Sequence, residues 1–444
     1  MSKAIVSRRG LLSVGASALA AGLAPAIISP GRARAQQKTL KILQFKHFVP
    51  SFDEWFNGTF VKAWGEKNDT EVIVDYVGLA DIGGRAKAEI EARRGHDLVI
   101  VLAPTAIFED HVIDHREIYE ESERKYGKAI DFAIRSTYNP KTNKYFAFFP
   151  AYQPNVISYR RDLWDTVQVW PDNWANVLGG GRQIRLLHDK PVGLSLAPED
   201  NSNYTMRTIM YCFGASEQDA DGNPALKSQA MLEAIKYVKA LYDEAMSKDV
   251  LTWDAASNNR FMLNGEGSLT LDTVSIARAS ENMKLPLAND LQLAKVPAGP
   301  ARRIGPAFSF FNYLIWTFAE NIDGAKQFLV DYIGQSREAF LASRFQNTPA
   351  FPDTVPDLAT VVADDAGVGP PGKYELLADV ASWTTNVGDP GYTNAAIGEI
   401  FHAGLIPKMF ARAATGQVEP EEALDQADKE ARQIFQKWTE RGTL

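Results

Sequence analysis

The 444-residue chain contains one cysteine, Cys212, and after residue 28 no apolar segment approaches the roughly 18 residues of a membrane-spanning helix. A single thiol cannot close an internal disulfide, and it cannot supply the ligands of a zinc ribbon or an iron–sulfur cluster. The apolar run around Cys212 predicts a buried structural cysteine rather than a nucleophile. These absences exclude disulfide-stabilised scaffolds, cysteine-based metal sites and a membrane span after residue 28.

Basic side chains are also scarce. Lys and Arg number 47 against 55 Asp and Glu, and five of the basic residues lie in the first 35 positions, where no acid occurs. The chain after residue 35 therefore carries 42 basic and 55 acidic residues, a net charge of −13. Because a nucleic-acid binder needs basic groups to neutralise phosphates, and because an anionic membrane surface would repel this chain, neither is predicted as a partner.

Residues 1–35 have the pattern of an export signal. Arg8 and Arg9 precede an apolar run that extends to Ile28, and residues 33–35 (ARA) form a small-x-small cleavage site. Paired arginines followed by Leu-Leu predict the twin-arginine route, which exports folded proteins; an ordinary secretory signal that contains two arginines is the alternative. No cysteine lies near the cleavage site, which excludes a lipid anchor there. We expect a soluble periplasmic protein that is a monomer.

After the leader, short β-rich runs alternate with helical patterns. Residues 41–45, 72–76 and 98–102 are strand-like, and residues 51–64 and 82–94 between them have helical spacing. This order predicts a parallel sheet with right-handed crossovers. The 409 residues after the leader exceed the usual limit for one hydrophobic core, so two α/β domains are expected.

The predicted sheet points to a first set of ligand contacts. In open parallel sheets, ligands bind beyond the carboxyl ends of the strands. Here that position is occupied by His47 and Phe48 after the first strand, and by residues 103–105 after the third. His47, Pro104 and Thr105 are therefore candidate ligand-binding residues.

Four stretches along the chain carry a family resemblance. Residues 95–100 (GHDLVI) lie at the third strand, residues 152–163 contain an aliphatic-Tyr segment before Asp-Leu, residues 260–272 read RFMLNGEGSLTLD, and residues 416–423 read GQVEPEEA. Their order and spacing resemble family 1 of the extracellular solute-binding proteins, the maltose-binding type that serves ATP-binding-cassette (ABC) importers. The family's proline in the first motif is replaced here by His96.

The resemblance implies a two-lobed periplasmic binding protein fold, type II-like, in which each lobe is a mostly parallel sheet flanked by helices and is discontinuous in sequence. Residues 36–153 and 272–322 would form the first lobe, and residues 154–271 and 323–444 the second. A small ligand between the lobes would stabilise the closed form, which the permease subunits of an ABC importer would recognise. The implied function is binding without catalysis, and no cofactor is expected.

Positions that match the family's cleft extend the candidate site. Carbohydrates present C–H faces to aromatic rings and hydroxyls to polar side chains. The matching positions lie on the first crossing, on a second-lobe loop, after the returning strand and before the terminal helices: Tyr152, Gln153, Asn155, Ser202, Asn203, Tyr204, Asp272, Ser275, Trp383 and Tyr392. The family's Gly-x-Trp is replaced by residues 273–275 (TVS), which favours a small or non-cyclic ligand such as a polyol.

The same residues leave other functions open. A carbohydrate or polyol is the predicted ligand, and a polyamine or other cationic ligand is the alternative because the chain is acidic. A secreted glycoside hydrolase or a twin-arginine-exported oxidoreductase is the alternative among enzymes. His111 and His115 could share a helix face as a metal pair, but two surface histidines are favoured, and residues 179–181 (GGG) predict a flexible turn rather than a phosphate loop. No catalytic or metal site is therefore predicted.

Overall fold

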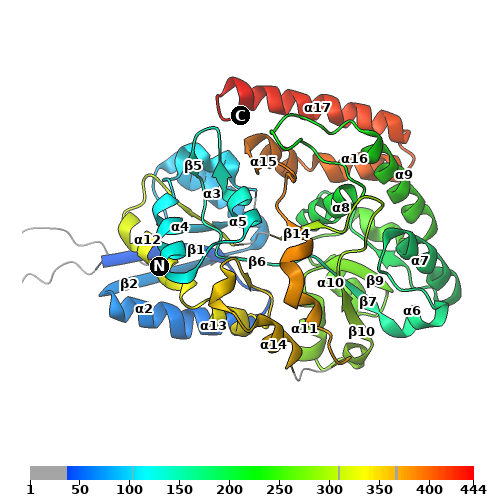
Figure 1. Cartoon of the computed structure of the whole chain (residues 1–444), viewed down its shortest axis with the longest axis horizontal. Helices are drawn as coiled ribbons and strands as arrows, with labels where there is room; N and C mark the ends of the chain where they lie inside the picture. Colours follow the sequence, from blue (N-terminus) through cyan, green and yellow to red (C-terminus); the bar gives the residue numbers. More distant parts are fainter. Residues whose placement is uncertain (1–37, 103, 309–310, 366–368) are drawn as a thin grey trace, which may run out of the picture. The chain divides into compact units, whose positions relative to one another are not determined.

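The computed structural model describes residues 38–444 except 103, 309–310 and 366–368 (Figure 1). The predicted export signal at residues 1–35 and its cleavage site lie outside the described residues. No helix in the described part of the chain is long and apolar enough to cross a membrane.

The first sheet has four strands in the order β12-β3-β1-β2. Its strands are β1 (Lys38–Phe45), β2 (Thr70–Val77), β3 (Leu98–Val101) and β12 (Asn312–Ile315). Strand β1 is parallel to β2 and β3, whereas β12 comes from much later in the chain and is antiparallel to β3. The parallel sheet predicted from the first three apolar runs is confirmed, because such runs are typical of strands that are covered on both faces.

Aromatic side chains join the first helical segment to a helix from late in the chain. Helix α1 (Pro50–Trp55), a π-helical turn η1 (Phe56–Val61) and α2 (Lys62–Lys67) follow one another, and α12 (Ile322–Ile333) packs on them. The ring of Phe328 lies 5.1 Å from that of Phe60 and 5.2 Å from that of Trp64. Such ring pairs bury large apolar areas and stabilise the cover of the first sheet.

The second sheet has the strand order β10-β7-β9-β8. Its strands are β7 (Val156–Arg160), β8 (Val192–Gly193), β9 (Leu269–Asp272) and β10 (Leu291–Ala294). Among these described strands, β8 and β9 are parallel, whereas β7 is antiparallel to both β9 and β10. The expectation of a mostly parallel sheet in each lobe therefore holds for the first sheet, and the second is mixed.

The packing differs from the predicted lobe boundaries at two places. Strand β10 lies within residues 272–322, which were predicted for the first lobe, yet it pairs with β7 of the second sheet. Helix α12 lies almost wholly within residues 323–444, predicted for the second lobe, yet it packs on the helices of the first sheet. The sequence did not indicate these positions because both segments are apolar and either sheet could bury them.

The other helices and short strands complete the fold (Figure 1). The short strands form the pairs β4 (Tyr138–Asn139) with β5 (Lys144–Tyr145), β6 (Ala151–Tyr152) with β13 (Thr348–Pro349), and β11 (Gly305–Pro306) with β14 (Thr384–Thr385). The helices are α3 (Ile82–Ala92), α4 (Arg116–Tyr126), α5 (Asp131–Thr137), α6 (Arg161–Val167), α7 (Trp174–His188), α8 (Asp200–Cys212), α9 (Gln229–Glu244), α10 (Ser257–Leu263), α11 (Ser275–Asn282), α13 (Ser336–Ala342), α14 (Leu358–Ala363), α15 (Ala395–His402), α16 (Leu405–Ala414) and α17 (Pro420–Glu440). Short 3-10 segments are η2 (Leu79–Asp81), η3 (Ala106–His111), η4 (Lys248–Leu251), η5 (Pro286–Asn289), η6 (Pro352–Thr354) and η7 (Glu375–Trp383).

Two local predictions are wrong. Residues 179–181 lie inside helix α7 instead of forming a flexible turn, and a Cβ added at Gly180 would lie 2.6 Å from the ring of Trp164. His115 is fully buried rather than on the surface, and its Nε2 accepts the Ile315 N–H at 3.1 Å. Burial lowers the pKa of His115 to about 4 and keeps the imidazole neutral.

A glycine next to the second sheet provides a test of its packing. An alanine Cβ at Gly267 would lie 1.9 Å from the ring of Phe261, which is itself buried. We therefore expect Gly267→Ala to lower the free energy of unfolding by about 1–3 kcal/mol through overpacking. The matched control is Gly84→Ala in α3, where no atom lies within 4 Å of the added Cβ. That variant should be neutral or stabilised by up to about 1 kcal/mol, because alanine favours the helix; equal effects of both variants in urea denaturation would contradict the packing.

Candidate functional site

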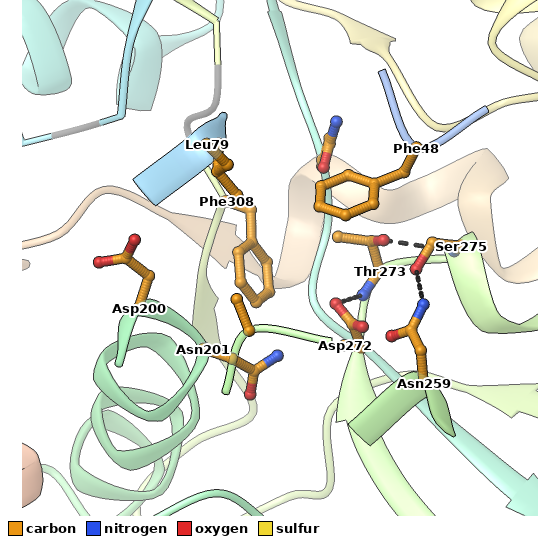
Figure 2. A pocket seen from close by; sticks show the side chains of 11 residues that line it. Phe48, Leu79, Asp200, Asn201, Asn259, Asp272, Thr273, Ser275 and Phe308 are labelled. Atoms are coloured by element: carbon orange, nitrogen blue, oxygen red, sulfur yellow. Dashed lines mark hydrogen bonds between the residues drawn. The ribbon is translucent and has the colours of Figure 1, made fainter. Parts of the chain in front are cut away.

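A pocket opens where strands of both sheets end, and Figure 2 shows it. It encloses about 400 Å³ of space between the side chains, part of which is open to solvent. The lining residues come from segments distant in sequence: Phe48, Leu79, Gln153, Asp200, Asn201, Ala255, Asn259, Asp272, Thr273, Ser275 and Phe308. The pocket therefore joins elements of the first sheet, the second sheet and the crossings between them.

The first sheet and the first crossing supply three of these residues. Phe48 follows the carboxyl end of β1, and Leu79 follows that of β2. Gln153 comes directly after β6 and is fully buried. Its backbone exchanges two hydrogen bonds with Phe308, from Gln153 N to Phe308 O at 3.0 Å and from Phe308 N to Gln153 O at 2.8 Å. These bonds hold the two crossing segments side by side at the pocket.

The side chain of Gln153 has unused hydrogen-bonding capacity. Its Nε2 donates to Asn347 Oδ1 at 3.3 Å, and the same Asn347 oxygen lies 3.0 Å from His47 Nε2. Its Oε1 is buried and has no hydrogen-bond partner among the described residues. Buried polar atoms are normally paired, so this oxygen is placed to accept a hydrogen bond from a bound molecule.

The second sheet contributes a carboxyl group at the end of β9. Asp272 is only 8 % exposed; its Oδ1 accepts the Thr273 N–H at 2.7 Å and its Oδ2 accepts Asn258 Nδ2 at 2.8 Å. Burial disfavours the charged form and raises the pKa of Asp272 to about 6. Ser275 Oγ accepts Asn259 Nδ2 at 3.3 Å, which places two more polar side chains beside the carboxyl group (Figure 2).

Helix α8 begins at the pocket. Glu199 is its N-cap and accepts the backbone N–H groups of Asn201 at 2.6 Å and Ser202 at 2.7 Å, as an acidic cap does. Burial raises the pKa of Glu199 to about 7, and burial also raises the pKa of Asp200. The cap positions Asp200 and Asn201 in the pocket lining (Figure 2).

Three of the thirteen residues predicted from the sequence lie together in this pocket: Gln153, Asp272 and Ser275. The other ten do not line it. His47 is buried, and its Nε2 lies 3.0 Å from Asn347 Oδ1; burial lowers the pKa of this histidine to about 4. Pro104 accepts a hydrogen bond from His402 through its carbonyl oxygen, and Thr105 is fully buried.

The residues around the first crossing are displaced by strand geometry. Successive side chains of an extended segment point to opposite faces, so Tyr152 points away from Gln153 and its ring meets that of Phe132 edge-on at 4.8 Å. Asn155 is on the same face as Gln153, but its amide donates to Pro306 O at 2.8 Å and is covered by β11.

The α8 residues predicted as contacts lie slightly too far along the helix. Ser202 donates its hydroxyl to Ala197 O at 2.6 Å, and Asn203 Oδ1 accepts from Arg207 at 2.7 Å. The ring of Tyr204 lies 4.2 Å from that of Phe308 and therefore supports the pocket wall from behind. The acidic residue Glu199 was the available sequence signal for the start of the helix, and it places Asp200 and Asn201 in the first helical turn.

The two aromatic candidates near the C-terminus have structural contacts. Trp383 is buried at the end of η7, and its Nε1 donates to Asp379 Oδ1 at 3.4 Å. The ring of Tyr392 lies 5.9 Å from that of Tyr138. Phe308 lines the pocket, but no motif in the sequence distinguishes this phenylalanine from the many that are core residues.

Comparisons with known proteins identify the family and the fold of this chain. The family model for bacterial extracellular solute-binding proteins matches residues 50–344 of the chain. Among solved structures, a solute-binding protein from Thermotoga lettingae bound to α-D-tagatose has a TM-score of 0.73 at 15 % identity over 89 % of this chain and 99 % of that one. Maltose-bound MalE3 of T. maritima has a TM-score of 0.73 at 14 % identity, again over 89 % of this chain and 99 % of that one. A solute-binding protein from Agrobacterium radiobacter in complex with ribitol has a TM-score of 0.70 at 16 % identity, over 89 % of this chain and 98 % of that one.

A search of curated protein sequences found no match. The structural likenesses, at such low identity, concern the fold, and they confirm the predicted two-lobed periplasmic binding protein fold. The family profile covers well over half of the chain and confirms the resemblance that the four sequence motifs indicated. The chain belongs to the family of bacterial extracellular solute-binding proteins.

Proposed function

We propose that this protein captures a small carbohydrate or polyol in the pocket and delivers it to the permease subunits of an ABC importer. The observation that carries the proposal is the pocket itself, which is lined by residues after β1 and β2 of one sheet and by the end of β9 of the other. Relatives of this fold were solved with tagatose, maltose and ribitol, and that range of ligands supports a hydroxyl-rich ligand here.

The proposed mechanism is closure of two lobes around the ligand. We assign the first sheet with α1, α2 and α12 to one lobe, and the second sheet with α8 and α11 to the other. A ligand that contacts Phe48 and Gln153 on one side and Asn201 and Asp272 on the other favours the closed arrangement, because it has more contacts there than in an open one. The crossings that include Gln153 and Phe308 would act as hinge segments.

The proposed cellular context follows from the sequence. Export through the twin-arginine leader would place a soluble monomer in the periplasm, without a lipid anchor. The proposed role is binding and delivery without chemical turnover, as the family of solute-binding proteins implies.

A thermal-shift screen of the purified mature protein tests the proposal. With D-tagatose, ribitol and maltose among the probes, at least one hydroxyl-rich compound should raise the melting temperature. A ligand at 100 times its dissociation constant adds about 2.7 kcal/mol to the free energy of unfolding. A screen without any stabilising sugar or polyol would contradict the proposal. Release of monosaccharides from maltose would instead identify the secreted glycoside hydrolase that the sequence left open.

Gln153→Ala provides a mutational prediction for the same site. Loss of the buried amide should weaken the binding of the stabilising sugar by about 1–3 kcal/mol, a factor of roughly 5 to 150 in the dissociation constant. The matched control is Gln433→Ala on the exposed face of α17, for which no change is expected. Isothermal titration calorimetry measures both, and equal affinities of the two variants would show that the ligand does not occupy this pocket.

A further inference from the structure

We propose that Gln153 and Asn347 together recognise one hydroxyl group of the ligand, which donates its hydrogen to one of the two amides and accepts a hydrogen from the other. This inference rests on the proposed function and deepens it. It adds Asn347, which lies directly behind the residues that line the pocket, and it specifies the chemical group that the two amides bind.

The two amide side chains lie side by side at the first crossing. Strands β6 and β13 are antiparallel, with Tyr152 opposite Thr348, so the adjoining residues Gln153 and Asn347 come opposite each other. The hydrogen bond from Gln153 Nε2 to Asn347 Oδ1, at 3.3 Å, shows that both side chains are on the same face of the pair. Because Gln153 lines the pocket, the Asn347 amide is in contact with its wall.

His47 fixes the direction in which the two amides point. The Val49 N–H donates to His47 Nδ1 at 2.9 Å, so the neutral imidazole carries its proton on Nε2, which lies 3.0 Å from Asn347 Oδ1. This oxygen therefore accepts hydrogen bonds from both His47 and Gln153. The opposite tautomer of the imidazole would reverse both amides and would again leave one donor and one acceptor without a partner.

A donor and an acceptor of this amide pair remain unsatisfied. Asn347 Nδ2 and Gln153 Oε1 are both buried and have no hydrogen-bond partner among the described residues. Other buried atoms of the described chain also lack a partner, such as the hydroxyls of Ser122 and Ser268, but these do not line the pocket. Here the two atoms belong to amides that are hydrogen-bonded to each other, and one of these amides lines the pocket. That combination indicates a group supplied by the ligand.

The chemistry of the two free positions selects a hydroxyl group. A hydroxyl has a donor and an acceptor on one oxygen, whereas an ammonium group only donates and an ionised carboxylate only accepts. An ammonium group would leave Asn347 Nδ2 unpaired, and a carboxylate would leave Gln153 Oε1 unpaired. Because an unpaired buried polar group is costly, the pair favours a sugar or polyol over the polyamine that the acidic composition left open.

The backbone before Asn347 is held in a strained conformation. Arg344 has φ 51° and Phe345 has φ 75°, in the left-handed region that bulky side chains rarely adopt. Arg278 holds both residues: its Nε donates to Arg344 O at 2.9 Å, and its guanidinium lies 4.8 Å from the centre of the Phe345 ring. Arg278 belongs to α11, whose first residue, Ser275, lines the pocket. Such strain persists only where the surroundings fix the segment, so the Asn347 amide is preorganised for binding.

Analogues that lack single hydroxyl groups test the inference. The parent probes are D-tagatose, ribitol and maltose, each with its set of monodeoxy analogues, and isothermal titration calorimetry at pH 7.5 measures their affinities. For the parent that binds most tightly, we expect the loss of one particular hydroxyl to weaken binding at least about 10-fold. The reason is that the buried donor and acceptor are then left unpaired in the complex.

Leucine variants assign that hydroxyl to the amide pair. Gln153→Leu and Asn347→Leu should each reduce the preference for the parent at this same hydroxyl position, and the double variant should abolish it. The other monodeoxy analogues should keep their wild-type affinities relative to the parent. The matched control is Asn289→Leu, at an exposed position outside the pocket, which should leave every preference unchanged.

A crystal structure of the wild-type complex is a second measurement that requires no variant. It should place one ligand hydroxyl within hydrogen-bond distance of both Gln153 and Asn347. A water molecule bound between the two amides in the complex would overturn the inference, as would variants that change the preference at different hydroxyls or at none. These outcomes leave the proposed function intact, because the parent still binds. A protein that binds none of the three parents would overturn the proposed function together with the inference.

Discussion

Asp272→Asn is expected to raise the free energy of unfolding of the ligand-free protein by about 1–3 kcal/mol at pH 7.5, and to change it little at pH 4. The folded-state pKa of this carboxyl group is raised from 3.8 to about 6, mainly by burial. The folded protein therefore holds the proton more tightly than the unfolded chain does. A rise of about two in the pKa of this group corresponds to a free-energy difference of about 3 kcal/mol at most. The asparagine amide makes less favourable hydrogen bonds than the protonated carboxyl group, which reduces the gain in stability.

The sign of this effect sets the pH window of the experiment. The stability that protonated Asp272 contributes is fully present below about pH 4, and it is lost as the pH rises through 6. Asparagine resembles the protonated form, so the gain of the variant should appear across this interval. Urea denaturation at pH 4 and pH 7.5 measures it, with Asp221→Asn, at an exposed position outside the pocket, as the control. A variant that is less stable than wild type at pH 7.5, or one with the same gain at both pH values, would contradict the buried and unpaired state of Asp272.

Glu217→Leu is expected to lower the free energy of unfolding by about 3–5 kcal/mol, because it would leave a buried charge without its partner. The side chains of Arg207 and Glu217 are both 0 % exposed, and Arg207 Nε donates to Glu217 Oε1 at 2.6 Å. Tyr211 donates its hydroxyl to Glu217 Oε2 at 3.3 Å. Arg207 and Tyr211 belong to α8, the helix whose first turn lies at the pocket.

The double variant Arg207→Met with Glu217→Leu distinguishes charge burial from simple loss of packing. Replacing both partners by apolar side chains of similar size is often close to neutral, so the double variant should recover most of the lost stability. Chemical denaturation of the single and double variants forms the test. A double variant as unstable as Glu217→Leu alone would show that packing, rather than the unpaired guanidinium, causes the loss.

The sequence predicted the parts of the fold that depend on local pattern. Apolar runs with helices between them indicated the parallel part of the first sheet. Because ligands bind beyond the carboxyl ends of the strands in such sheets, the end of the first strand indicated the region of His47 and Phe48. The family resemblance added Gln153, Asp272 and Ser275. In each case the chemical signal lies within a few residues: an apolar strand, its end, and the polar side chain that follows.

Other features depend on contacts between distant segments. A run of three glycines has the composition of a turn, but at residues 179–181 it lies inside α7, which approaches Trp164 closely at Gly180 and Val192 closely at Gly181. The burial of His115 depends on β12, some 200 residues later, whose Ile315 N–H binds it. Strand β10 could not be assigned to the second sheet because an apolar run does not reveal its neighbour.

By itself, the sequence determined that this protein is an acidic α/β chain with an export pattern and the motif order of a solute-binding protein. Only the tertiary structure decided which polar groups share a pocket, and that no basic side chain of the described residues lines it beside Asp200, Asp272 and Gln153. The physical reason is that periodicity and capping are properties of neighbouring residues. Desolvation and unpaired charge, in contrast, arise only when segments more than 100 residues apart enclose the same space.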